Sequence, residues 1–149
     1  LYAQEVVLKN GRHGRFDASL EEILHLVTDN GYANTYPHIF GTHANTKIAL
    51  AMDKARGGHF TKIPTHYPKG AWYTYHDKTC DYSCQITEYT YWIITSHLGG
   101  QDFPGRGKEI NNEWKLYTPQ LVKNDKKGYA IITNPIYALP DKLPDGHYK

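Results

Sequence analysis

Three glycine-containing stops divide much of this chain into segments with helical periodicity. Each stop follows a stretch in which apolar residues recur at intervals of three and four, and the stops are Asn30-Gly31, Gly57-Gly58 and Gly99-Gly100. That spacing is typical of helices packed on one face, and glycine is frequent just past a helix end. The pattern predicts helices over residues 19–29, 44–56 and 85–98.

The remaining segments add a small β element and several connections to this helical frame. Residues 2–16 contain a strand pattern and two glycines, which predicts an N-terminal β-hairpin. Residues 59–82 form a long loop rich in Pro, Gly, Tyr and His, and such loops are often functional. Residues 110–117 and 119–132 are expected to be helical, with a proline-rich, extended tail. We therefore expect a mainly α fold with a small N-terminal β-hairpin, in the α+β class.

Length and charge narrow the class of protein. A chain of 149 residues is the size of one domain and can bury a proper core, so we expect a single domain over residues 1–149. Its net charge of +2 comes from scattered basic residues, which argues against a nucleic-acid reader. No apolar run approaches the ~18 residues needed to cross a bilayer. Because Leu1 is not preceded by a methionine, we expect the mature or C-terminal part of a longer precursor.

The two cysteines leave two alternatives open. Cys80 and Cys84 are close enough for a tight local disulfide that holds a loop ahead of the next helix, or both remain free thiols. A zinc site of the four-cysteine type is excluded, because there is no second pair. The 13 tyrosines and 3 tryptophans suit a wet binding surface. Together these features favour an extracellular, secreted protein.

The first predicted helix carries the only concentrated set of metal-ligand types, Glu21-Glu22-Ile-Leu-His25. At about 100° per residue, Glu21 and His25 lie one turn apart at the edge of the apolar stripe, and Glu22 lies beside them. Two ligands at i and i+4, with a carboxylate between them to activate a water, is how a helix presents a catalytic metal.

A structural alternative explains the same residues. Ser19 and Glu22 have the spacing of a capping box, in which Glu22 would only cap a backbone N–H. Glu21 would then be a first-turn acid favoured by the helix dipole, and His25 a partly buried polar residue.

The pattern resembles the zinc-binding helix of the zincin metallopeptidases, His-Glu-x-x-His, with Glu21 in place of the first histidine. The resemblance implies that Glu21 and His25 are zinc ligands and that Glu22 is the general base. A carboxylate at the first position makes the site more anionic and the zinc a weaker Lewis acid.

The gluzincin type of this family takes its third ligand from a glutamate on a later helix, and Glu88 corresponds to that position. The string Cys80-Asp-Tyr-Ser-Cys84, followed by Glu88, is similar to secreted proteins with a Glu-Glu-x-x-His helix; this resemblance spans residues 16–148. It implies a zincin-like helical core. Tyr91, or another loop tyrosine, would donate a hydrogen bond to the oxyanion.

Two functions follow from these observations. The first is a secreted zincin-like metalloprotein that hydrolyses peptide bonds with a metal-activated water. The second is a non-catalytic secreted binding or structural protein on a degenerate metallopeptidase scaffold, whose tyrosine-rich surface binds a small ligand or a second copy of the chain in a homo-oligomer. The expected partners are a peptide or small-molecule ligand, without nucleic acid or membrane.

Overall fold

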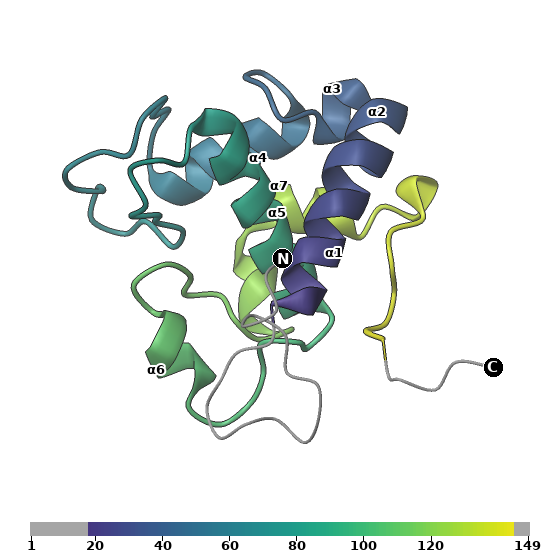
Figure 1. Cartoon of the computed structure of the whole chain (residues 1–149). Coiled ribbons are helices and arrows are strands. Elements are labelled where there is room, and N and C mark those ends of the chain that lie inside the picture. Colours follow the sequence, from purple (N-terminus) through teal and green to yellow (C-terminus); the bar gives the residue numbers. More distant parts are fainter. Residues whose placement is uncertain (1–17, 145–149) are drawn as a thin grey trace.

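The computed structural model describes residues 18–144, which are mainly helical and contain no strand, only one antiparallel bridge between Tyr73 and Trp114 (Figure 1). The predicted β-hairpin over residues 2–16 lies outside the described residues. The elements, in chain order, are α1 (Ser19–Leu26), the π-helix η2 (Val27–Tyr32), α2 (Ala33–Thr35), α3 (Pro37–Phe40), α4 (Lys47–Arg56), α5 (Tyr82–His97), α6 (Arg106–Ile110), the 3₁₀-helix η3 (Leu121–Asn124), α7 (Lys126–Ile132) and the 3₁₀-helix η4 (Pro135–Tyr137).

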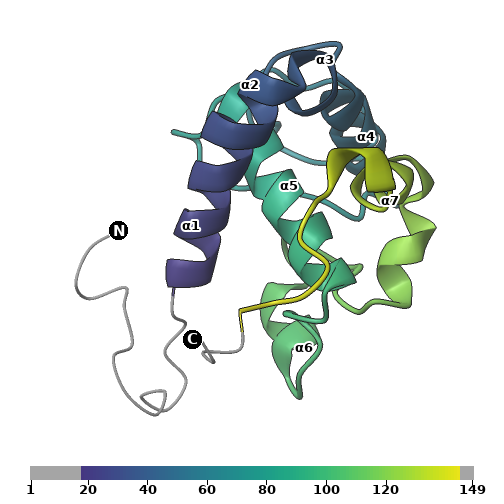
Figure 2. The ribbon, with the colours of Figure 1, turned by 90° about the vertical axis from the view of Figure 1, so that its right-hand side faces the viewer.

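Helix α5 is the centre of the fold. Helices α1, α4 and α7 all pack against it (Figures 1 and 2). Its side chains are buried on nearly every face, including Ile86, Tyr89 and Ile93. Burying each such apolar side chain contributes about 1.5–3 kcal/mol to the stability of the fold. Because α5 buries so many of them, the hydrophobic core forms around this helix. Asp81 caps its start, because the Asp81 side chain accepts a hydrogen bond from the Cys84 N–H at 2.9 Å.

The helices predicted over residues 44–56 and 85–98 are confirmed as α4 and α5, although each begins a few residues away from its predicted start. Helix α4 begins after Thr46, whose hydroxyl accepts from the Ala49 N–H, and ends at Gly57 in the left-handed conformation. Helix α5 begins at Tyr82, one turn before the expected start, because of the Asp81 cap.

The first helical segment does not end at Gly31. It continues as η2 and then α2, up to Thr35. Glycine costs only about 1 kcal/mol inside a helix. Here the continued helix carries Tyr32, which packs edge-on against Phe40 and donates its hydroxyl to the Ala138 carbonyl at 2.8 Å. Tertiary packing therefore outweighs the local stop signal.

Of the two C-terminal helix predictions, the one for residues 110–117 is wrong and the one for residues 119–132 is confirmed in most of its length. Only Ile110 of residues 110–117 is helical, because Trp114 is pulled into the core, where it is fully buried and donates to the Ser96 hydroxyl at 2.9 Å. Residues 119–132 split into η3 and α7 at Asp125, which takes a non-helical conformation and caps α7 through the Gly128 N–H.

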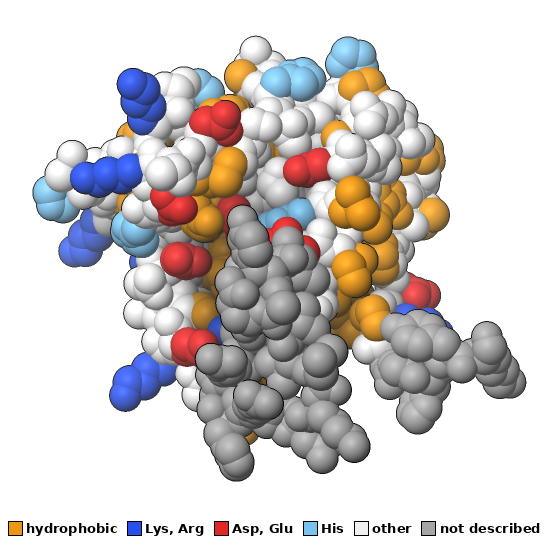
Figure 3. All heavy atoms as spheres, viewed as in Figure 1, with side chains coloured by type: hydrophobic (Ala, Val, Ile, Leu, Met, Phe, Trp, Pro, Cys, Tyr) orange, Lys and Arg blue, Asp and Glu red, His pale blue; other side chains and the backbone are white. Residues whose placement is uncertain are grey.

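The apolar stripe of α1 is only partly buried. Leu24 lies in the core, whereas Ile23 and Val27 remain 60% and 40% exposed. Both line a shallow apolar groove of about 160 Å³ between α1, α5 and the C-terminal segment. Hydrophobic side chains accordingly gather over α1 on the right of the molecule in Figure 3. The helix therefore turns its polar strip, and not only its apolar one, toward α5.

Cys80 and Cys84 form a disulfide at the N-terminal end of α5, which decides between the two alternatives left open by the sequence. Replacing both cysteines with serine should lower the free energy of unfolding by about 2 kcal/mol, because the bond closes a loop of only a few residues. Urea denaturation would measure the loss. Reduced wild-type protein should show the same decrease, and a loss above about 4 kcal/mol would contradict this entropic account.

Among residues 18–144, none of the helices combines the length and apolar character required to span a bilayer.

Candidate metal centre

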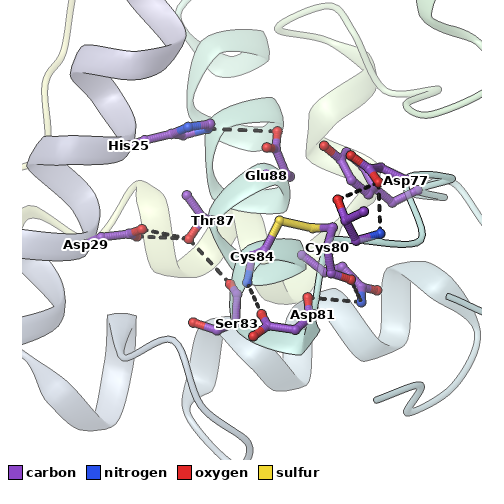
Figure 4. Close-up of a disulfide and its surroundings, with 12 residues drawn as sticks. His25, Asp29, Asp77, Cys80, Asp81, Ser83, Cys84, Thr87 and Glu88 are labelled. Carbon is purple, nitrogen blue, oxygen red and sulfur yellow. Dashed lines mark hydrogen bonds and ion pairs between the residues drawn. A yellow bond between two sulfur atoms is a disulfide. The ribbon is translucent and has the colours of Figure 1, made fainter. Parts of the chain in front are cut away.

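Glu21, His25 and Glu88 come together between α1 and α5. One ligand atom from each of the three residues lies within 4.8 Å of the other two. Glu21 and His25 are one turn apart on α1, as the sequence predicts, and Glu88 reaches them from α5. Figure 4 shows His25 and Glu88 pointing toward each other from the two helices. This is the only such group of His, Cys, Asp and Glu side chains within the described part of the chain.

His25 provides the clearest evidence that the cluster fits a metal. Its Nε2 atom is buried and has no hydrogen-bond partner among the described residues. A carboxylate oxygen, Oε2 of Glu88, lies 3.8 Å away, which is too far for a hydrogen bond. A buried polar atom left unsatisfied costs about 1–3 kcal/mol. Coordination of a cation by Nε2 would remove this cost.

The spacing of the three side chains also fits a shared ion. Two ligands on a tetrahedral zinc, each about 2.1 Å from the metal, lie about 3.4 Å apart. The 3.8 Å between His25 Nε2 and Glu88 Oε2 is close to that value. A carboxylate oxygen of Glu21 completes the group within the same 4.8 Å limit.

Acidic side chains are crowded at this site. Burial raises the pKa of Glu88 to about 8, and the nearby carboxylate of Glu21 is the next largest cause. Burial also lowers the pKa of His25, against the opposing charges of Glu22 and Asp29. Both directions describe a partly dry site in which carboxylates repel one another and the imidazole is neutral. A divalent cation would offset that repulsion, and a neutral imidazole is the form that ligates metal.

Two of the three side chains of the cluster also line a pocket. Glu21 and Glu88 form part of the wall of a pocket of about 340 Å³. Its other lining residues are a tyrosine, a tryptophan and residues of α6 and the chain after it, namely Tyr75, Trp92, Arg106, Glu109, Ile110, Asn112 and Glu113. An open side is what separates a catalytic metal site from a closed structural one. The pocket can therefore admit a ligand beside the two carboxylates and the imidazole of the cluster.

The remaining predicted residues lie close to the cluster in different settings. Glu22 is exposed on α1, and its charge acts on both His25 and Glu88. Tyr91 is on α5 and is buried, with its ring edge-on to the His25 ring at 5.8 Å between centroids. Its hydroxyl accepts a hydrogen bond from Gln101 Nε2 at 3.0 Å, and burial raises its pKa to about 12. Their catalytic roles remain predictions.

The structure does not show the predicted capping box. Ala18 occupies the N-cap position of α1, and no side-chain cap hydrogen bond is formed there. Ser19 is already inside the first turn, so Ser19 and Glu22 do not stand at the two positions that the motif requires.

Tyr75 and Arg106 are pocket residues that the sequence did not single out. Tyr75 comes from the long loop and lines the pocket with Glu88, and its hydroxyl lowers the Glu88 pKa against the effect of burial. Tyr67 holds the Tyr75 backbone, donating to its carbonyl at 2.9 Å. The buried Arg106 donates to Gln101 at 2.7 Å and pairs with Glu109 at 3.1 Å. Neither residue lies in a motif, so only the long loop itself indicated this region.

Comparison with known proteins gives no further assignment: no family model, no curated protein and no solved structure matches this chain.

Proposed function

We propose that this chain is a secreted, zincin-like metalloprotein that binds one divalent metal ion, zinc in the first place, through Glu21, His25 and Glu88. The observation that carries the proposal is the convergence of three ligand side chains from two helices around the buried Nε2 atom of His25, which has no hydrogen-bond partner within residues 18–144. The Cys80–Cys84 disulfide supports an oxidising, extracellular location.

We propose peptide-bond hydrolysis as the reaction, on the strength of the open pocket beside the cluster. Zinc at such a site supplies Lewis-acid polarisation of a carbonyl and lowers the pKa of water. Glu22, next to Glu21 on α1, would take the proton from the attacking water and pass it to the leaving amine.

A hydroxyl is also needed to donate a hydrogen bond to the substrate carbonyl oxygen as negative charge develops there. Tyr75 is better placed for this task than Tyr91, because Tyr75 lines the pocket beside Glu88, whereas Tyr91 is not among the residues that line it. The α6 region, with Ile110 and the paired Arg106 and Glu109, would form the opposite wall of the substrate site.

The first test is the metal content of the purified protein, measured by elemental mass spectrometry. The proposal expects about one zinc per chain after reconstitution and dialysis, and a metal-free protein would overturn it. Metal binding without hydrolysis of any peptide in a broad library would instead favour the non-catalytic binding protein.

Glu22→Gln is expected to keep the metal but lower kcat for peptide hydrolysis about 10²- to 10⁴-fold, because the amide cannot accept the proton. Rates on a cleaved library peptide, together with metal content, would measure this. Asp141→Asn is the matched control, since it removes one exposed carboxylate from the C-terminal segment. An unchanged rate in Glu22→Gln would exclude Glu22 as the base.

A further inference from the structure

Glu21 and His25 belong to a longer polar strip that ends at Asp29. The three residues follow one another at intervals of four, so each lies about one turn beyond the last. In a regular α-helix this interval overshoots a full turn by about 40°, and the strip would drift around the helix. Asp29, however, lies in the π-helix η2, where each residue turns the chain less. The π-helix therefore keeps Asp29 on the same face as His25.

Thr28 offers a local reason for the change from α1 to η2. Its side chain is buried, and its hydroxyl donates back to the Leu24 carbonyl at 2.9 Å and lies 3.2 Å from the His25 carbonyl. Such back-bonding competes with the backbone N–H groups and disturbs the regular α-helical pattern.

Asp29 contacts α5 at the residue next to a proposed ligand. The Thr87 hydroxyl lies 2.8 Å from Asp29 Oδ2 and 3.0 Å from Oδ1, and Thr87 is 8% exposed. The alternative acceptor on its own helix, the Ser83 carbonyl, is 3.4 Å away. Asp29 is thus the favoured acceptor, and a bond to a charged carboxylate is stronger than one between neutral groups. Figure 4 shows this contact beside the His25–Glu88 pair.

We propose that the Asp29–Thr87 hydrogen bond holds α1 and α5 in the register that brings His25 and Glu88 to one metal ion. Asp29 follows His25 by one turn, and Thr87 immediately precedes Glu88. A shift of one helix along the other would therefore stretch this hydrogen bond and at the same time move His25 and Glu88 apart. Asp29 and Thr87 are positioning residues for the metal centre. The inference rests on the metal site proposed above.

The test compares Zn²⁺ affinity and the Co²⁺ absorption spectrum in three threonine variants of the full chain. Thr87→Val keeps the shape but removes the hydroxyl, and it should weaken Zn²⁺ binding about 10- to 100-fold and shift the Co²⁺ d–d bands. Thr87→Ser restores the hydroxyl and should recover most of the affinity. Thr90→Val is the matched control: Thr90 is buried on the same helix, but its hydroxyl donates only to the Ile86 carbonyl at 2.7 Å. It should bind Zn²⁺ like wild type.

A double-mutant cycle that combines Thr87→Val with Asp29→Ala tests whether the two side chains affect Zn²⁺ affinity through the same hydrogen bond. If the two side chains act through one bond, Thr87→Val should cost little further affinity once Asp29 is alanine. Additive losses would overturn the proposal, as would wild-type affinity and spectrum in Thr87→Val with only a lowered Tm. If wild-type protein binds neither Zn²⁺ nor Co²⁺, the proposed function itself fails. Equal binding by wild type and Thr87→Val refutes only the positioning role.

Discussion

Replacing His25 with alanine is expected to reduce zinc from about one ion per chain to none detectable. The imidazole is the only nitrogen ligand of the proposed site, and its Nε2 atom is the buried group that lacks a hydrogen-bond partner among the described residues. Without it, two carboxylates from different helices remain to hold the ion. Elemental analysis after dialysis would measure the loss.

His97→Ala is the matched control for that experiment. Like His25, His97 lies on a helix with its ring edge-on to a tyrosine, in this case Tyr129 at 5.4 Å between centroids. Both substitutions therefore remove a similar aromatic contact, but only His25 belongs to the cluster. Equal metal content in His25→Ala and His97→Ala would contradict the assigned ligands.

Glu88→Gln separates metal binding from folding. Glutamine keeps the shape of the side chain and removes a carboxylate that faces Glu21, so the metal-free protein should be as stable as wild type or more so. Zinc should then raise the Tm of wild type but not of Glu88→Gln, because only a ligand that binds the native state stabilises it.

Asp125→Ala is expected to lower the free energy of unfolding by about 3–5 kcal/mol, the largest effect on stability that we predict. The Asp125 carboxylate is 1% exposed and accepts three hydrogen bonds: from Tyr89 Oη at 2.7 Å, Trp72 Nε1 at 2.9 Å and the Gly128 N–H at 3.0 Å. Removing it leaves these three donors without that acceptor and opens a cavity between α5, α7 and the long loop. Urea denaturation would measure the change.

Asp125→Asn is the companion variant. It keeps one oxygen acceptor but turns an amide N–H₂ toward groups that donate, so it should lose part of the stability, about 2 kcal/mol. If Asp125→Ala cost less than about 1 kcal/mol, the three hydrogen bonds would not be the link between α7, the long loop and α5.

Part of this site could be predicted from the sequence because it depends only on the helical period. Residues four apart lie one turn apart on any helix, so Glu21 and His25 had to share a face once that segment was helical. The same reasoning could have included Asp29, which continues the spacing. Glu88 was assigned through the resemblance to the zincins, and its approach to His25 depends on the packing of α1 along α5.

Other features depended on contacts between residues far apart in the chain. The local sequence predicted a helix end at Gly31 and a helix through Trp114, and both predictions were wrong. The burial of aromatic side chains contributes more to the free energy of folding than the helix propensity of a single residue. Tyr75 reaches Glu88 only because Tyr67 and the chain around Trp114 hold the long loop in place.

The amino-acid sequence alone thus indicated the helices α1, α4 and α5 and the two ligands that share a turn of α1, since each is set by neighbours within a few residues. The tertiary structure decided where the first helical segment ends, which face of α1 turns toward α5, and how Glu88 meets His25 beside the pocket. These outcomes depend on the burial of side chains and on the pairing of buried polar groups between residues far apart in the chain, which cannot be predicted from a short segment of sequence.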